Sequence, residues 1–200
     1  ITFVVMKLLR KILILLNPVY FLFVWLRNKA YDSGLFKSKF YDFPVICVGN
    51  LSLGGTGKTP MVEYLIRMLK YNYRLAVLSR GYGRKSQGFV LADSNSNSIS
   101  LGDESFQIKS KFPEITVAVD NDRQHGIASL QAIDQPPKII LLDDAFQHRR
   151  VKAGFSVLLT SYNDLYCDDL VLPAGNLREP RSGAQRAHIV VVTKCPQNLS

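Results

Sequence analysis

The stretch SLGGTGKT, residues 52–59, decides the fold of this 200-residue chain. Phosphate-binding loops follow the pattern G-x-x-x-x-G-K-[ST], and the stretch departs from it only at the first position, where Ser52 replaces glycine. That position only enters the turn, so a small residue is acceptable there. We expect Gly54, Gly55 and Gly57 to curl the backbone so that its N–H groups point at phosphate oxygens.

The segments on either side of this stretch support the interpretation. Residues 43–50 are apolar and rich in β-branched side chains, as in a buried strand, and 60–71 repeat apolar residues at helical spacing. Lys58 would supply positive charge for the β- and γ-phosphates of ATP, and the Thr59 hydroxyl could bind Mg²⁺. A chance GKT in a glycine-rich turn is the competing interpretation. The nucleotide-binding residues that we predict are Ser52, Leu53, Gly54, Gly55, Thr56, Gly57, Lys58 and Thr59.

The rest of the chain alternates short apolar runs with loops or helical stretches. This alternation predicts an α/β fold of the P-loop NTPase type, with a mostly parallel sheet flanked by helices. Because 47% of the residues are hydrophobic, the chain can bury the core of one domain. The glycine- and serine-rich segment 79–100 predicts a loop with a short hairpin. The expected strands are 43–50, 74–80, 115–120, 138–144, 155–160 and 188–194.

Two acids directly follow one of these strands. The apolar run 139–142 leads into Asp143 and Asp144, which would lie at the carboxyl end of the strand, where α/β proteins bind ligands. A phosphate loop needs a further acidic group for Mg²⁺, usually at the end of a neighbouring strand. We therefore predict that Thr59, Asp143 and Asp144 bind the metal. A surface turn capped by two acids is the alternative.

The N-terminal segment, residues 1–30, differs from the rest of the chain. The run 12–26 is apolar except at Asn17, has basic residues on both sides, and no acid occurs before Asp32. It is shorter than the roughly 20 apolar residues of a spanning helix, and no clear signal-peptide cleavage site follows it. We expect a membrane-associated helix beside acidic headgroups, with a buried core helix as the alternative. The remainder, 31–200, is expected to form the P-loop core.

Composition limits the partners. The 25 Lys and Arg residues exceed the 16 Asp and Glu residues, and the resulting charge of +9 suits nucleic acid, a phosphorylated ligand or an acidic membrane. The chain has no nucleic-acid recognition motif, so we expect no nucleic-acid partner. Its three cysteines form no C-x-x-C pair, which favours reduced thiols over a zinc site or a disulfide framework.

Local motifs separate the classes of phosphate-loop protein. GTPases read guanine with an N-K-x-D motif, but the corresponding residues 193–196, TKCP, lack the aspartate. Partitioning-type ATPases carry an extra lysine before the paired glycines, where this chain has Leu53. A small-molecule kinase remains.

Six short motifs occur in order along the chain: VGNLSLGGTGKTP (48–60), SRGYGRK (79–85), GDES (102–105), DNDR (120–123), LLDDAFQHRR (141–150) and LPAGNLREP (172–180). In this set the chain resembles the tetraacyldisaccharide 4′-kinase family of lipid A biosynthesis, whose members also carry Ser or Thr in place of the first loop glycine. Ala145 stands where the family usually has glycine and Ser105 where proline is common, but neither is a reacting group. Family proteins are longer, so we expect a C-terminal portion with a further active-site histidine outside this chain.

The resemblance implies a reaction and its cofactors. Family enzymes transfer the γ-phosphoryl group of ATP to the 4′-hydroxyl of tetraacyldisaccharide 1-phosphate, which gives lipid IVA. The implied cofactors are ATP and Mg²⁺, and the implied partners are the acylated disaccharide lipid and the inner-membrane surface, on its cytoplasmic face. A non-catalytic or switch-type membrane-associated nucleotide-binding protein is the alternative function.

The resemblance also implies roles for individual residues. It points to Asp103 as the base that takes the proton of the sugar hydroxyl and to Lys58 as the catalytic lysine. A solvated acid pair at a helix N-terminus is the alternative for Asp103 and Glu104. We expect Glu179 to orient Arg178 or to assist Mg²⁺. The candidates for the substrate pocket are Glu104, Arg80, Tyr82, Arg123, Gln147, His148, Arg178 and Glu179.

Overall fold

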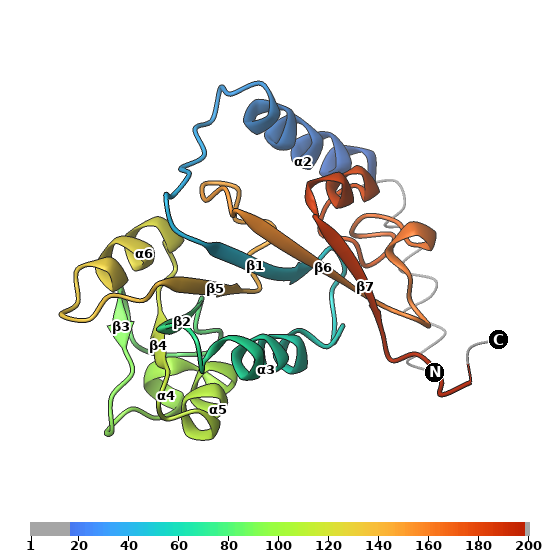
Figure 1. The fold of residues 1–200 in the computed structure, drawn as a ribbon. Helices are drawn as coiled ribbons and strands as arrows, with labels where there is room; N and C mark the ends of the chain where they lie inside the picture. Colours follow the sequence, from blue (N-terminus) through green and yellow to red (C-terminus); the bar gives the residue numbers. More distant parts are fainter. Residues whose placement is uncertain (1–16, 199–200) are drawn as a thin grey trace.

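The strand before the glycine loop, β1 (Val45–Asn50), lies inside a seven-stranded sheet of the computed structural model, which describes residues 17–198 (Figure 1). The strand order is β3-β4-β2-β5-β1-β6-β7, and every neighbouring pair is parallel except β3 and β4. The expected strands are all present, so the α/β fold with a mostly parallel sheet is confirmed. The other strands are β2 (Leu75–Ser79), β3 (Val90–Leu91), β4 (Thr116–Val119), β5 (Ile139–Asp143), β6 (Phe155–Ser161) and β7 (Ile189–Thr193).

Helices flank the sheet on both faces (Figure 1). α3 (Lys58–Leu69) and α5 (Asp103–Lys111) bury apolar side chains in one hydrophobic core, and α6 (Arg123–Gln131) buries its own in a second core on the opposite face. Successive residues of β1 alternate between the two cores, as the period of a strand requires. Shorter helical turns are α4 (Ser98–Leu101), η2 (Tyr166–Asp168) and η3 (Arg181–Arg186).

The short hairpin expected within 79–100 is wrong. β3 pairs antiparallel with β4, which follows in the chain only after α4 and α5. The polar residues between them serve other local structure, since Asn97 caps α4 by accepting a 3.0 Å hydrogen bond from the backbone N–H of Ser100. The backbone edge of β4 is available for hydrogen bonds with β3. Because β4 is far from β3 in the sequence, this pairing leaves no signal in the residues near β3.

The N-terminal apolar run is helical where the structure describes it. α2 (Asn17–Asp32) begins inside the run and continues past residue 30, whereas residues 12–16 of the run lie outside the described part. Val24 is the one buried side chain of this helix. Within residues 17–198, no helix combines the length and the apolar character needed to cross a bilayer.

Candidate active site

The glycine loop between β1 and α3 has the curled backbone that phosphate binding requires, although one glycine differs from expectation. Gly54 has φ 115° and Gly57, the N-cap of α3, has φ 84°, which side chains other than glycine adopt at a cost. Gly55 does not have a positive φ, and a Cβ placed on it would meet nothing closer than the Lys194 Nζ at 3.9 Å. The prediction that Gly55 is needed to curl the backbone is therefore wrong.

The loop is clamped by a residue that the sequence analysis missed. Asn50, the last residue of β1, is fully buried, and its Nδ2 donates to the Thr56 hydroxyl at 2.9 Å and to the Gly54 carbonyl at 3.4 Å. Its Oδ1 accepts a 3.5 Å hydrogen bond from Lys58 Nζ. From β7, the Thr193 hydroxyl donates to the Thr56 carbonyl at 2.9 Å. The sequence signal that could have identified Asn50 is an amide side chain at the end of an apolar run that forms a strand.

The start of the loop is paired with a distant segment. Ser52 forms an antiparallel bridge with Leu177, and the Leu53 N–H donates to the Asn176 carbonyl at 2.7 Å. The N–H of Arg178 in turn donates to the Leu51 carbonyl at 2.7 Å. Ser52 is buried in this pairing, so its side chain only has to be small. This pairing also places Arg178 next to the loop.

The two acids after β5 differ in their surroundings. Asp143 is buried, and its Oδ1 has no hydrogen-bond partner among the described residues. Burial raises the pKa of Asp143 to about 7, helped by the nearby negative charges of Glu104 and Asp144 and opposed by Lys58 and Arg123. Asp144 has φ 46° and forms ion pairs at 3.6 Å with Lys58 and at 3.2 Å with Arg178.

These oxygens can be tested against the needs of Mg²⁺. No group of three or more His, Cys, Asp or Glu side chains is arranged as a metal site within residues 17–198. Mg²⁺, however, is usually held by one or two carboxylates together with substrate phosphates. The unpartnered Oδ1 of Asp143 fits this pattern. Asp144 would have to give up its contacts with Lys58 and Arg178 to join it.

A cavity of about 610 Å³ lies beside the loop and the two acids. It brings together residues from all six motifs, most of which follow the carboxyl ends of the parallel strands. Glu179 and Asp103 are not in its lining. Asp103 is exposed at the first residue of α5, and its neighbour Glu104 faces the cavity instead. The lining residues are Lys58, Ser79, Arg80, Tyr82, Glu104, Asn121, Arg123, Asp144, Gln147, His148 and Arg178.

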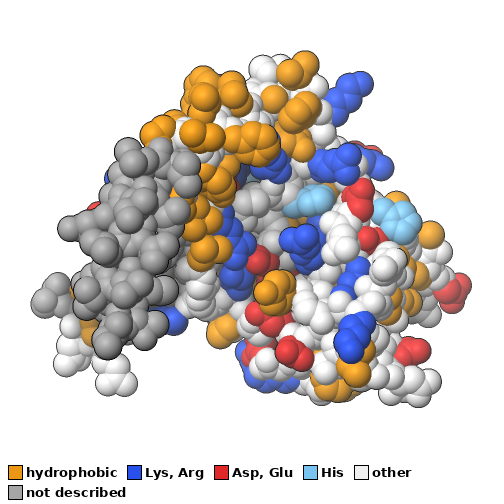
Figure 2. Space-filling model, turned by 180° about the vertical axis from the view of Figure 1, so that it is seen from behind, with side chains coloured by type: hydrophobic (Ala, Val, Ile, Leu, Met, Phe, Trp, Pro, Cys, Tyr) orange, Lys and Arg blue, Asp and Glu red, His pale blue; other side chains and the backbone are white. Residues whose placement is uncertain are grey.

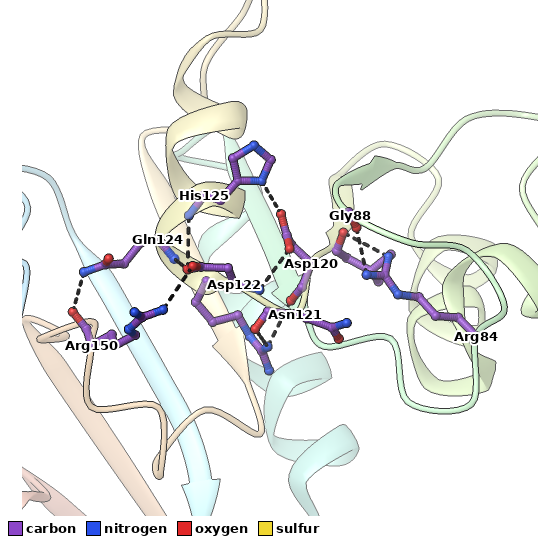
Figure 3. Close-up of polar contacts among 10 residues, drawn as sticks. Arg84, Gly88, Asp120, Asn121, Asp122, Gln124, His125 and Arg150 are labelled. Carbon is purple, nitrogen blue, oxygen red and sulfur yellow. Dashed lines mark hydrogen bonds and ion pairs between the residues drawn. The ribbon is translucent and has the colours of Figure 1, made fainter.

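Arg123 is presented to the cavity by a rigid turn after β4. Its Nη1 donates to the carbonyls of Asp120 at 2.9 Å and Asn121 at 3.3 Å, while its Nε is buried with no partner among the described residues. The Asp120 carboxylate lies 2.6 Å from His125 Nδ1, and Asp122 caps α6 (Figure 3). Burial, followed by the charge of Arg80, lowers the pKa of the Arg123 guanidinium. The turn thus holds a desolvated cation at the cavity wall.

Gln147 and Glu179 form a buried network behind the cavity. Gln147 Nε2 donates to the Asn50 carbonyl at 2.8 Å and to Glu179 Oε1 at 3.0 Å. Glu179, only 2% exposed, also accepts from Arg186 at 2.8 Å and from Asn28 at 3.0 Å. The prediction that Glu179 orients Arg178 is wrong, because the carboxylate that contacts Arg178 is that of Asp144. Its alternative, that Glu179 assists Mg²⁺, stays a prediction.

Two further features complete the site. His148 is half-buried, and burial together with the charge of Arg123 lowers the pKa of its imidazole to about 4, so it is neutral at pH 7. Helix α2 supports the site loops from behind, a role that the sequence analysis missed. Tyr20 Oη donates to the Arg178 carbonyl at 2.9 Å, and Arg27 Nη2 donates to the Gln147 carbonyl at 2.9 Å.

A curled glycine loop between β1 and α3, with carboxylates at the end of the adjacent β5, defines a P-loop nucleotide-binding protein. The family model described as tetraacyldisaccharide-1-P 4′-kinase, LpxK, matches residues 9–200. The chain belongs to this family.

Relatives extend the comparison. The tetraacyldisaccharide 4′-kinase of Flavobacterium johnsoniae is 63% identical over 195 residues, which cover 98% of this chain and 57% of the relative. That of Bacteroides thetaiotaomicron is 57% identical over 182 residues, covering 90% of this chain and 48% of the relative. The chain therefore spans about half the length of the curated relatives it matches. The crystal structure of "apo" form LpxK from Aquifex aeolicus in complex with ATP has a TM-score of 0.85 and 38% identity, covering 93% of this chain and 59% of that one.

Proposed function

We propose that this chain carries the nucleotide-binding part of a kinase that transfers the γ-phosphoryl group of ATP to the 4′-hydroxyl of tetraacyldisaccharide 1-phosphate and so forms lipid IVA. The observation that carries the proposal is the cavity beside the glycine loop, where Lys58, Arg123 and Arg178 meet. A cationic wall next to a phosphate loop suits a reaction whose charge develops on phosphoryl oxygens. Family membership and the ATP complex of the Aquifex relative support the same activity.

The nucleotide would be held by residues 52–59, with Lys58 at the β- and γ-phosphates. In the structure the ammonium group of Lys58 contacts the side chains of Asn50 and Asp144, which hold it beside the loop. Mg²⁺ would be held by Thr59, Asp143 and Asp144, and it would neutralise part of the phosphate charge when bound. The unpartnered oxygen of Asp143 is the observation that supports this assignment.

The acceptor would lie on the other side of the cavity. Arg80, Arg123 and Arg178 would hold anionic groups of the two substrates. Tyr82, Gln147 and His148 line the same space and would contact the sugar. Asp103 would take the proton of the 4′-hydroxyl. Because Glu104 and not Asp103 lines the cavity, this role requires the acceptor to extend past Glu104 to the first residue of α5.

The lipid substrate gives α2 a role at the membrane. Val19, Leu22, Phe23 and Leu26 follow one another at helical spacing, and all four side chains are exposed. We therefore assign residues 1–30 to a membrane-associated segment and 31–200 to the kinase core, at the cytoplasmic face of the inner membrane. The exposure of these side chains argues against the alternative of a buried core helix.

The deciding experiment is a kinase assay in detergent micelles with the full-length protein, including the C-terminal portion that is expected from the family. With Mg-ATP and tetraacyldisaccharide 1-phosphate, we expect a 4′-phosphorylated product. Folded protein that binds ATP but forms no product would overturn the proposal and favour the switch-type alternative.

A variant pair tests the base. Asp103→Ala should abolish turnover while ATP binding survives, and Asp134→Asn, a change to another exposed acid that does not line the cavity, should leave turnover intact. Loss of ATP binding by Asp103→Ala would remove Asp103 from the role of base.

A further inference from the structure

The loop that follows α2 exposes three large apolar side chains. Leu35 is 76% exposed, Phe36 48% and Phe40 60%. We call residues 34–40 the 34–40 loop. Single exposed apolar residues are common on protein surfaces, but a cluster of large ones usually marks a contact with another molecule.

The 34–40 loop is held in place by the rest of the protein. The Phe36 N–H donates to the Ala30 carbonyl at 2.9 Å, and the Lys39 N–H donates to the Arg150 carbonyl at 2.8 Å. The Lys39 carbonyl in turn accepts from the Lys152 N–H at 2.9 Å. The apolar side chains are thus displayed by an ordered backbone, so little conformational entropy would be lost when they are covered.

Positive charge surrounds these side chains. Lys37 and Lys39 lie between Phe36 and Phe40 in the sequence and are exposed. A hollow of about 660 Å³ adjoins the loop, and its wall carries ammonium, guanidinium, hydroxyl and amide donors. Lys37, Ser38, Lys39, Gln124 and Arg150 supply these donors. Of these donors, the Arg150 guanidinium is paired with Asp122 at 3.3 Å.

We propose that the 34–40 loop is a second membrane contact, in which Leu35, Phe36 and Phe40 enter the bilayer interface and the hollow takes the phosphate of an anionic phospholipid. Apolar side chains interleaved with cations match the two layers of such a surface, acyl chains below and negative headgroups above. The proposal rests on the proposed membrane association of α2. Figure 2 shows hydrophobic side chains gathered over one side of the molecule next to the grey residues, with Lys and Arg side chains at their margin.

The 34–40 loop would fix the orientation of the protein on the membrane, which α2 alone cannot do. A single helix lying in the interface leaves the protein free to roll about the helix axis. A second contact that is set off from this axis removes the rotation. The orientation of the cavity relative to the bilayer is then defined, so the 4′-hydroxyl of a lipid held in the membrane would meet the site in one geometry.

Vesicle binding by the full chain tests the proposal. Sedimentation is measured with vesicles of phosphatidylcholine alone and with about 30 mol% phosphatidylglycerol. For the double variant Lys37→Gln/Lys39→Gln, we expect binding to anionic vesicles to fall about tenfold or more, while binding to neutral vesicles is unchanged. The control Lys85→Gln/Lys138→Gln removes the same charge from exposed positions outside the loop. Equal losses in the two double variants would overturn the proposal.

Two further arms separate the possible outcomes. Leu35→Ser/Phe40→Ser should weaken binding to both kinds of vesicle, and because both side chains are exposed the variant should fold. Inorganic phosphate, at matched ionic strength, should not compete; competition would show a site for free phosphate and overturn the lipid assignment. Leu22→Ser/Phe23→Ser tests α2 itself. If only this variant loses binding, the loop proposal fails and the membrane role of α2 stands. If only the loop variants lose binding, the role of α2 fails.

Discussion

Replacing Glu179 by alanine should loosen the network behind the active site and destabilise the fold. The carboxylate is 2% exposed and accepts hydrogen bonds from Arg186 at 2.8 Å and from Gln147 and Asn28 at 3.0 Å. Removing one partner of a buried ion pair costs about 3–5 kcal/mol. The Arg186 side chain is partly exposed and can regain water, so we expect about 3 kcal/mol, the lower end of this range. For a chain of this size that is a fall in Tm of about 6–12 °C.

The assay is urea unfolding of the full chain, with activity measured on the same preparations. Since Gln147 lines the cavity, we also expect a lower kcat for Glu179→Ala, partly restored in Glu179→Gln, whose amide oxygen can still accept a hydrogen bond. The matched control is Glu114→Gln, which breaks a 2.6 Å ion pair with Lys70 at the surface and should cost much less. A loss of stability no larger than that of the control would refute the buried network. An increased requirement for Mg²⁺ at unchanged stability would instead place Glu179 at the metal.

Three further changes test the loop and the cavity. Asn50→Ala removes the clamp on the loop and should weaken ATP binding about tenfold at little change in fold, as measured by calorimetry and circular dichroism. Gly57→Ala should be strained by about 1–2 kcal/mol and lose ATP binding, whereas Gly55→Ala should retain it; equal losses would contradict the observed backbone. Because the folded pKa of His148 is lowered to about 4 from 6.5, its contribution to stability is present above pH 6.5 and is lost as the pH falls toward 4. Between pH 7.5 and about 5, the free energy of unfolding of the wild type should fall by about 1 kcal/mol more than that of His148→Gln, after allowance for solvent screening. Urea unfolding can measure this difference. Its absence would show that the imidazole is exposed to water.

The sequence by itself determined the positions of six strands and the position of the phosphate loop between the first of them and the helix that follows. These features depend on local properties: apolar runs of strand length, helical spacing after residue 60, and glycines between them. The pair Asp143 and Asp144 was predictable for the same reason, because parallel strands carry their ends to one edge of the sheet. Most residues of the cavity could be predicted because short motifs follow those strand ends.

Only the tertiary structure decided which side chains meet. Tyr20 and Arg27 contact loops more than one hundred residues away, and nothing local in the sequence of α2 indicates those partners. Whether Asp103 or Glu104 faces the cavity depends on how α5 is rotated against the sheet, which its packing sets. Glu179 was predicted to orient its sequence neighbour Arg178 or to assist Mg²⁺, but Arg178 pairs with Asp144 instead. The hydrogen-bond partners of Glu179 are Asn28, Gln147 and Arg186. A buried carboxylate needs hydrogen-bond donors, and here the tertiary structure supplies them.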